Sequence, residues 1–264
     1  MPWTRDFRLS EPPRREIHLI PRNANDWEAQ CNHSIDSLLD LAREKKTFPR
    51  LGKKRDEKMP ILGARFDVAI ERSASSLFGI IGRGAHMNVY VRSPSGLKIW
   101  VPQRGLQKAT YGGMLDNCVA GGVAAEEMPF DCIVREAEEE AGLDDRVVRE
   151  QAKPVGTVGY FNVSDEKAGG EVGLMNPGLL YCYDLEVGED AVFKVVDDDV
   201  HAFHLMTMEE AMESMREGRW KPASALVMLD FFVRHGIVTA ENENDYAEIV
   251  SRLRRRLPFP TRPS

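Results

Sequence analysis

The part of the chain with the clearest capacity for chemistry is an acidic run near its middle. Four glutamates follow Arg135 within five residues: Glu136, Glu138, Glu139 and Glu140. On a helix, side chains three and four residues apart share a face, so Glu136, Glu139 and Glu140 converge while Glu138 points away. Such a cluster opposes folding unless a cation binds it, and Mg²⁺ is usually bound by a few carboxylates together with the phosphates of a substrate. The run therefore predicts a helix that acts as a Mg²⁺ platform for phosphate chemistry.

The residues around this run predict where the helix begins and ends. Pro129 suits a first helical position, and Gly142 supplies the left-handed residue that ends a helix. Upstream, Gly121-Gly122 lets the chain leave a strand and turn sharply without a side chain on the metal side. Glu127 lies in that turn, where it can reach the metal or Arg135. Because the planar guanidinium of Arg135 suits clamping a carboxylate, we interpret it as an orienting residue and not as a nucleophile.

The whole stretch is similar to the Nudix box. That pattern reads Gly, five residues, Glu, seven residues, Arg-Glu, an apolar residue, any residue, Glu-Glu, any residue, Gly and an apolar residue. The alternative is a solvated acidic helix, which charge runs usually form. A match in register at nine spaced positions favours the box, although Ala137 is small for its apolar position. The matching residues are Gly121, Glu127, Arg135, Glu136, Ala137, Glu139, Glu140, Gly142 and Leu143.

The resemblance implies an enzyme that hydrolyses diphosphates with Mg²⁺, or with Mn²⁺ as the alternative cation. Metal ligands would then be Glu127, Glu136, Glu139 and Glu140, and catalytic residues would be Arg135, Glu139 and Glu140. The metal would bridge phosphate oxygens, lower the pKa of a bound water and neutralise charge that develops at phosphorus. The sequence leaves open whether Glu139 or a later acid takes the proton of that water.

Similarity to one Nudix subgroup extends over roughly residues 10 to 262. This subgroup carries an extra N-terminal domain and is labelled thiamine pyrophosphokinase-related; its members resemble fungal and plant enzymes that remove phosphate from thiamine diphosphate and damaged analogues of it. Kinases hold ATP with a glycine-rich phosphate loop, and no GxxxxGK[ST] occurs here. The segments that carry the resemblance include Trp100-Val101-Pro102, Arg104, Lys108, Gly113 to Asn117, Tyr183 to Glu186 and Leu257 to Pro260.

The loops expected to face the substrate depart from the subgroup. Where relatives commonly read Asp-Gly-Glu-Val-Glu, this chain has Asp197-Asp198-Asp199-Val200-His201. We predict substrate contacts by Arg104, Lys108, Asp199 and His201, with Asp199 as the second candidate for the general base. The alternatives are an ordinary surface histidine at position 201 and solvated charges at positions 104 and 108. The departures indicate that specificity has shifted while the metal box is retained.

Composition and charge narrow the class of protein. The 264 residues carry a net charge of -7, which disfavours nucleic acid as a bulk electrostatic partner. No apolar run approaches the ~20 residues of a membrane span. The four cysteines have no zinc-binding spacing; they could form two disulfides, but Cys118 and Cys132 lie in apolar surroundings and are expected to be reduced core residues. We expect a soluble, cytoplasmic enzyme that acts on a small molecule and binds neither nucleic acid nor membrane; a homodimer is left open.

The predicted elements define an α/β fold: a Nudix α/β/α sandwich, residues 83–264, preceded by a small N-terminal α/β domain, residues 1–82. In the N-terminal domain, residues 1–22 are expected to be loosely held. A helix capped by Asn25 is expected from Asp26 to about Lys45, and short strands at Asp67–Ile70 and Leu77–Ile81. In the sandwich, strands are predicted at Met87–Val91, Leu97–Val101, Leu115–Ala120, Val155–Val163, Leu179–Val187 and Val200–Met206. Further helices are predicted from Thr207 to near Gly218, from Pro222 to Gly236 and from about Asn244 to Arg256.

Three functions fit these patterns. The favoured one is a Mg²⁺-dependent diphosphatase for thiamine diphosphate or a related organic diphosphate. The second is a Nudix hydrolase for another nucleoside or prenyl diphosphate, which the altered loops support. The third is a non-catalytic sensor that binds a diphosphate, although a sensor has no need to keep every metal ligand of the box.

Overall fold

The computed structural model describes residues 1–20, 25–52, 54, 56–196 and 198–262. The chain divides into two compact units. One contains Met1–Ile81 together with Val163–Asn176 and the residues from Pro258 onward, and the other contains Gly82–Asn162 and Pro177–Leu257. The sequence prediction had given both later segments of the first unit to the second domain. The domain limits 1–82 and 83–264 stay a prediction.

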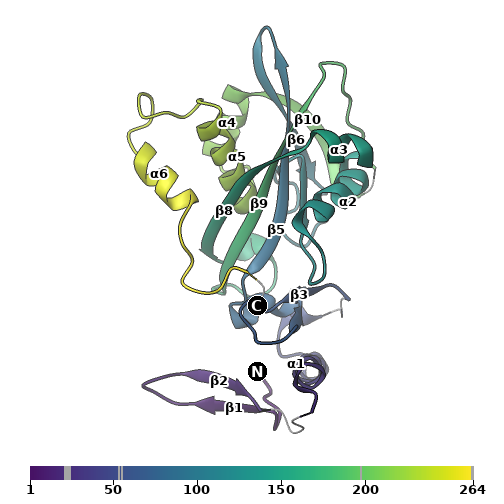
Figure 1. Ribbon diagram of the computed structural model, residues 1–264, viewed down its shortest axis with the longest axis vertical. Helices are drawn as coiled ribbons and strands as arrows, with labels where there is room; N and C mark the ends of the chain where they lie inside the picture. The colour runs from purple at the N-terminus through teal and green to yellow at the C-terminus, as the bar shows by residue number, and fades with distance from the viewer. Residues whose placement is uncertain (21–24, 53, 55, 197, 263–264) are drawn as a thin grey trace. The chain divides into compact units, whose positions relative to one another are not determined.

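The second unit is built on a six-stranded mixed sheet (Figure 1). Its order is β10-β6-β5-β9-β8, and β7 pairs with β5 beside β6. The central strand β5 is parallel to β9 and antiparallel to β6 and β7, so the predicted hairpin of β5 and β6 is confirmed. The strands are β5 (Gly82–Ser93), β6 (Gly96–Arg104), β7 (Val119–Gly122), β8 (Lys153–Val163), β9 (Met175–Val187) and β10 (Val200–Thr207).

Helices cover both faces of this sheet, which confirms the α/β/α sandwich (Figure 1). One face carries α2 (Pro129–Ala141) and α3 (Asp145–Gln151), the second of which was not predicted. The other face carries α4 (Met208–Arg216), α5 (Pro222–Arg234) and α6 (Tyr246–Leu253). None of the helices in the described part of the chain combines the length and apolar composition needed to cross a membrane.

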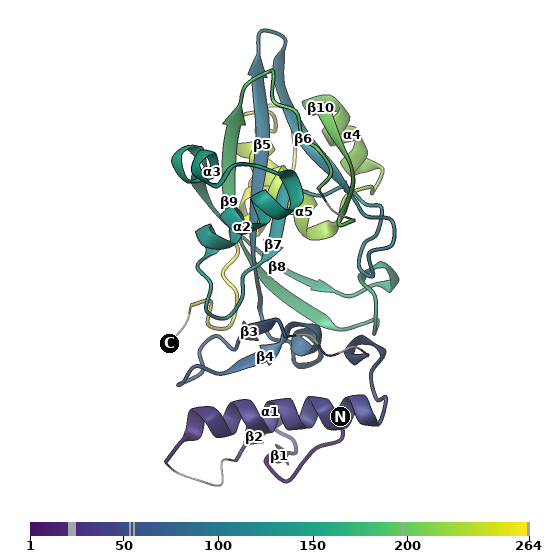
Figure 2. The same cartoon turned by 90° about the vertical axis from the view of Figure 1, so that its right-hand side faces the viewer.

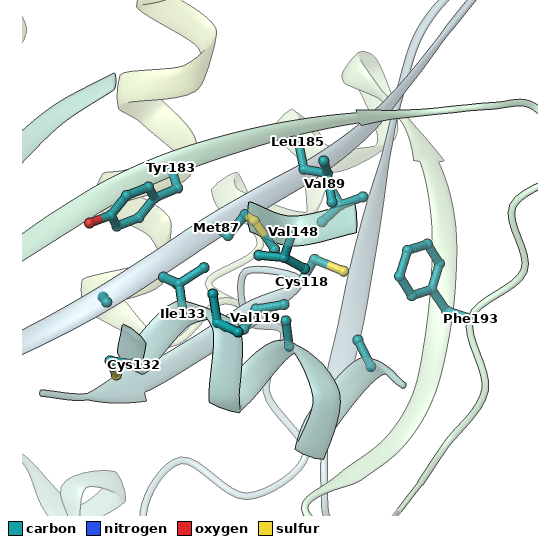
Figure 3. Packing of buried hydrophobic residues seen from close by; sticks show 14 of the residues in the cluster. Met87, Val89, Cys118, Val119, Cys132, Ile133, Val148, Tyr183, Leu185 and Phe193 are labelled. Carbon is teal, nitrogen blue, oxygen red and sulfur yellow. The ribbon is translucent and has the colours of Figure 1, made fainter. Parts of the chain in front are cut away.

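Alternation along β5 supplies both hydrophobic cores. Met87 and Val89 point to the α2 face, where they pack with Ile133 of the helix, as Figure 3 shows. Tyr90 points to the opposite face and packs with Phe231 of α5, with their ring centroids 5.5 Å apart. The four cysteines are free and buried, which confirms the prediction made for Cys118 and Cys132. Two of them, Cys118 and Cys132, belong to the core under α2.

Local sequence signals fix the ends of the functional helices. Pro129 is the first residue of α2, and Gly142 follows it with a φ of 62°, so both predicted boundaries are confirmed. Thr207 and Glu210 form the predicted reciprocal capping box at the start of α4. The predicted strand from Leu115 is wrong in its first half. Leu115 takes part in isolated bridges only, because there the chain crosses between β6 and the start of α5.

The first unit differs more from its prediction. Residues expected to be loose form a hairpin of β1 (Phe7–Ser10) and β2 (Glu16–Leu19). A second hairpin joins β3 (Lys58–Pro60) to β4 (Ala69–Glu71). The helix α1 (Trp27–Glu44) lies near its predicted place, although Asp26 and not Asn25 caps it, with its carboxylate 3.0 Å from the backbone nitrogen of Ala29 (Figure 2). The strand predicted at Leu77–Ile81 is wrong: Arg72–Phe78 is a 3₁₀ helix.

Candidate active site

The helical period of α2 places its apolar residues on one face and its acidic residues on another. Ile133, Val134 and Ala137 face the sheet and are almost fully buried, which anchors the helix (Figure 3). Glu138 and Glu139 are exposed, whereas Glu136 is largely covered, with a side chain 16% exposed. The anchored apolar stripe therefore presents acidic residues at the edge of the helix that lies along β7.

Arg135 gathers the carboxylates of the box. Its Nε lies 2.9 Å from Glu127 Oε1, and its Nη1 lies 2.8 Å from Glu136 Oε1 and 3.0 Å from Glu139 Oε2. Glu127 also accepts a hydrogen bond from the backbone nitrogen of Ala124, at 3.2 Å. Burial alone would raise the pKa of Glu127, but the hydrogen bonds from Arg135 and Ala124 hold that pKa below its ordinary value. Arg135 thus ties the turn to the helix.

Glu140 points to a different partner. Its Oε2 accepts a hydrogen bond from the backbone nitrogen of Ala120 in β7, at 3.0 Å. Burial is the main reason why the pKa of Glu140 is raised to about 8. The neighbouring Glu136 and Asp116 also raise this pKa, whereas the hydrogen bond from Ala120 and the charge of Lys221 lower it. A carboxyl group with this pKa is protonated at neutral pH until a cation stabilises its charged form.

Gly121 makes room for Glu136. A Cβ atom at this position would overlap the Cγ, Cδ and Oε1 atoms of the Glu136 side chain. The backbone of Gly121 is not in the left-handed region, so space and not backbone conformation requires glycine here. The glycine that opens the box pattern therefore lets a carboxylate lie against the strand.

We expect Gly121→Ala to weaken Mg²⁺ binding about tenfold or more, the usual effect of displacing a ligand through its surroundings. The new methyl group would push Glu136 away while Glu136 itself remains. Isothermal titration with Mg²⁺ measures the change, and thermal unfolding in EDTA should show little difference. Gly82→Ala is the matched control, because its Cβ would meet only the carbonyl oxygen of Pro177 at 3.9 Å. Equal Mg²⁺ affinity in both variants would contradict the role of Glu136.

The donor set fits a hard cation by its chemistry. Glu136, Glu139 and Glu140 all offer carboxylate oxygens, and Mg²⁺ prefers oxygen ligands. In the part of the chain that the structure describes, however, no three His, Cys, Asp or Glu side chains are already gathered for a metal. The reason is Arg135, whose guanidinium engages Glu136 and Glu139. A cation held by Glu136, Glu139 and Glu140 together would need the first two of these carboxylates to turn from Arg135 toward Glu140.

The residues predicted to bind substrate all lie in the second unit, but they differ in surroundings. Arg104 donates to Asp116 over 2.7 Å and is largely buried. Lys108 forms an ion pair with Asp199. His201 is exposed at a register shift between β10 and β6, and it makes no side-chain hydrogen bond or ion pair to another described residue. Asp197 lies outside the described residues.

No functional role was predicted from the sequence for two residues, Asp116 and Lys221, that the structure brings into contact. Asp116 was noted only within a segment that resembles the subgroup, and Lys221 was not singled out at all. The structure brings them together: Lys221 Nζ lies 3.1 Å from Asp116 Oδ2, across 105 positions of sequence. No local pattern marks Lys221, because its place depends on how α5 meets the strand that leads into the box.

A helix-flanked sheet that presents carboxylates beside a glycine-rich strand defines an enzyme of phosphate chemistry. The NUDIX domain model matches residues 82–227, more than half of the chain. The chain belongs to the Nudix family. It is accordingly a Nudix hydrolase, of the class that hydrolyses diphosphates, and members of this family generally use divalent metals such as Mg²⁺.

Two relatives illustrate the similarity. An uncharacterised protein of Saccharomyces cerevisiae, YJR142W, is 36% identical over 97% of this chain and 75% of its own length. Nudix hydrolase 20, chloroplastic, from Arabidopsis thaliana is 33% identical over 84% of this chain and 58% of its own length. The chain thus spans little more than half of that plant relative. A crystal structure of DR0079 from Deinococcus radiodurans aligns with a TM-score of 0.46 and 19% identity, over 75% of this chain and 100% of that chain.

Proposed function

We propose that this chain hydrolyses the diphosphate of a small organic molecule with the help of Mg²⁺ or Mn²⁺. The observation that carries the proposal is the placement of Glu136 and Glu140 against β7, with Glu139 beside them on α2, where Arg135 contacts both Glu136 and Glu139. Arg135 holds two of these carboxylates in the absence of metal. The family match supports the reaction class.

In this proposal Glu136, Glu139 and Glu140 hold the cation. When bound, the cation supplies positive charge to the phosphate oxygens and favours ionisation of the attacking water. Arg135 keeps the carboxylates in place before binding. Glu127 was predicted as a further ligand, but its oxygens are engaged by Arg135 and the backbone of Ala124, which favours a positioning role.

The proton of the attacking water needs a nearby base. Glu139 has a side chain 54% exposed, so it can reach a water at the surface of the site. Asp199, the other candidate, is ion-paired with Lys108. We therefore propose that Glu139 accepts the proton, while Glu140 stays fixed by the backbone of Ala120.

The substrate we propose is thiamine diphosphate or an analogue of it, on the strength of the subgroup resemblance. Other nucleoside or prenyl diphosphates are the alternative, because position 201 departs from that subgroup. The cytoplasmic location and the homodimer stay predictions from the sequence. The plant relative is chloroplastic by its name.

A phosphate-release assay over a panel of diphosphates tests the proposed function. The panel contains thiamine diphosphate, oxidised thiamine diphosphates, nucleoside diphosphates and prenyl diphosphates, each with Mg²⁺, with Mn²⁺ and with EDTA. We expect metal-dependent release that is strongest on thiamine-type compounds. If metal-dependent phosphate release occurred only with another class of diphosphate, that class would be the substrate and the thiamine proposal would be wrong. Binding of a diphosphate without release of phosphate would indicate a sensor and would contradict the proposed hydrolysis.

We expect His201→Glu to shift preference toward thiamine diphosphate by on the order of tenfold in kcat/KM, equivalent to about 1.4 kcal/mol. A carboxylate at this position restores the acid common in the subgroup and attracts the cationic thiazolium ring. His204→Glu, a change at another exposed histidine of β10, serves as the control. If both variants and the parent protein had the same kcat/KM for thiamine diphosphate relative to the other diphosphates, His201 would lie outside the substrate site.

A further inference from the structure

Asp116 lies at the centre of a buried cluster of opposite charges. The residue is only 4% exposed. Its Oδ2 accepts from Arg104 Nη1 at 2.7 Å and from Lys221 Nζ at 3.1 Å. Its Oδ1 accepts from the backbone nitrogen of Asn117 at 2.9 Å and from the hydroxyl of Ser224. One carboxylate oxygen therefore holds two cations side by side.

The cluster joins three elements by backbone bonds as well. The nitrogen of Asp116 donates to the carbonyl of Pro102 in β6 over 3.0 Å, and the nitrogen of Lys221 donates to the carbonyl of Leu115 over 3.0 Å. Lys221 is the residue immediately before helix α5, and Ser224 lies in the first turn of that helix. The two cations are thus fixed in position by the sheet and by the start of a helix.

The charges in the cluster do not balance. Two cations face one carboxylate, which leaves a surplus of one positive charge in largely buried surroundings. The Nε of Arg104 is buried, and within the described residues it has no hydrogen-bond partner. Lys221 uses one of its three donors on Asp116, and its side chain is 20% exposed, so it reaches solvent. This arrangement favours an anion at the exposed side of the cluster.

The cluster lies next to the carboxylates of α2. Asp116 comes just before β7, and the nitrogen of Ala120 in β7 binds Glu140. Only four positions separate Asp116, which holds Arg104 and Lys221, from Ala120, which holds Glu140. The positive side chains are therefore fixed to the same short segment of chain that contacts the acidic face of α2.

We propose that Lys221 and Arg104, both held by Asp116, form the anion-binding side of the active site, with Lys221 as a substrate contact and Asp116 as a positioning residue. The ligand is the phosphate group of the substrate. The ammonium of Lys221 donates to its oxygens, and the N-terminus of α5 adds favourable positive potential. Arg104 donates through Nη1 to Asp116 and through Nη2 to the carbonyl of Thr110, so it contributes positive charge rather than a direct hydrogen bond. This inference rests on the proposed function for its substrate and on the cluster for its binding site.

Binding of inorganic pyrophosphate and of methylenediphosphonate, measured by titration calorimetry in EDTA and again with Mg²⁺, tests the site without any turnover. We expect Lys221→Met to weaken binding about tenfold or more, as loss of a charged hydrogen bond implies. The same variant should raise KM for the best substrate by a similar factor and change kcat less. Lys221→Arg should recover most of the affinity. Thermal unfolding of each variant shows whether it is folded.

Arg219→Met is the matched control, because Arg219 is a neighbouring cation that is exposed and, among the described residues, forms its ion pair with Glu217. It should leave pyrophosphate affinity and KM unchanged. Failure of the parent protein to bind pyrophosphate, or unchanged affinity and KM in both Lys221 variants, would overturn the anion site even if diphosphates are hydrolysed. Loss of pyrophosphate affinity in Lys221→Met with no hydrolysis of any diphosphate by the parent protein would keep the anion site and remove the proposed function.

Discussion

Glu140→Gln should lower kcat by at least about a hundredfold while the protein stays folded, the loss expected when a key electrostatic group is removed from a site. Glutamine keeps the length of the side chain and can still accept the hydrogen bond from Ala120. What it loses is the negative charge that binds the cation. Steady-state kinetics at saturating Mg²⁺ measure the loss.

The same substitution should stabilise the protein without metal. The folded pKa of Glu140 is about 8 and the ordinary value is 4.5, so between these pH values the folded state keeps a proton that the unfolded state releases. The free energy of unfolding therefore falls as the pH rises from about 4.5 to 8, and glutamine avoids this loss. We expect Glu140→Gln to be more stable by about 2–3 kcal/mol at pH 9 in EDTA, and by much less at pH 5.

Glu138→Gln is the matched control for both measurements. Glu138 lies on the same helix two positions away and is exposed. It should keep its kcat and show no comparable pH-dependent gain in stability. If Glu140→Gln retained near-parental turnover with saturating Mg²⁺, the metal role assigned to α2 would be wrong.

Asp116→Asn should destabilise the protein by about 3–5 kcal/mol, the usual cost of removing one partner from a buried ion pair. Arg104 and Lys221 would then be left without their shared counter-charge. Burial raises the pKa of Asp116, but Lys221 and Arg104 outweigh it and hold the pKa well below its ordinary value. The stabilisation is therefore present above about pH 4, where an unfolded aspartate is ionised, and is lost as the pH falls toward the folded pKa.

Urea unfolding at pH 7 and at pH 3 measures this prediction, with the difference between parent and variant shrinking at the lower pH. Asp131→Asn is the control, since Asp131 is 55% exposed and pairs with the exposed Arg149 over 3.2 Å. Such a surface pair contributes at most about 1 kcal/mol. A loss below that figure for Asp116→Asn would mean that the cluster is not electrostatically important.

The sequence alone determined the parts of this protein that depend on local spacing. The limits of α2 follow from Pro129 and Gly142, and the face that carries Glu136, Glu139 and Glu140 follows from the helical period. Alternation along β5 likewise predicted its hairpin with β6. The family match confirms the resemblance at its coarser level, as a Nudix hydrolase. These features need no knowledge of distant parts of the chain.

In the first unit, local sequence patterns are too weak to predict the secondary structure. The hairpin of β1 and β2 has strands of only four residues. Apolar and polar residues alternate in each of them, but this stretch is too short, within a segment rich in Pro and Arg, to mark a strand by itself. The apolar residues of Leu77–Ile81 suggested a strand. Leu77 and Phe78 instead end the 3₁₀ helix Arg72–Phe78, which stops at Gly79 with a φ of 61°. Packing against the rest of the unit decides such short elements.

Only the tertiary structure brings Arg104 and Lys221 together on Asp116. The strands β6 and β7 share one edge of β5, with β7 pairing along Gly84–Met87 and β6 along Val89–Ser93. The chain between them brings Asp116 to the N-terminus of α5, where Lys221 lies. Because a carboxylate and an ammonium 105 residues apart meet through strand pairing and helix packing, no spacing in the sequence encodes their contact.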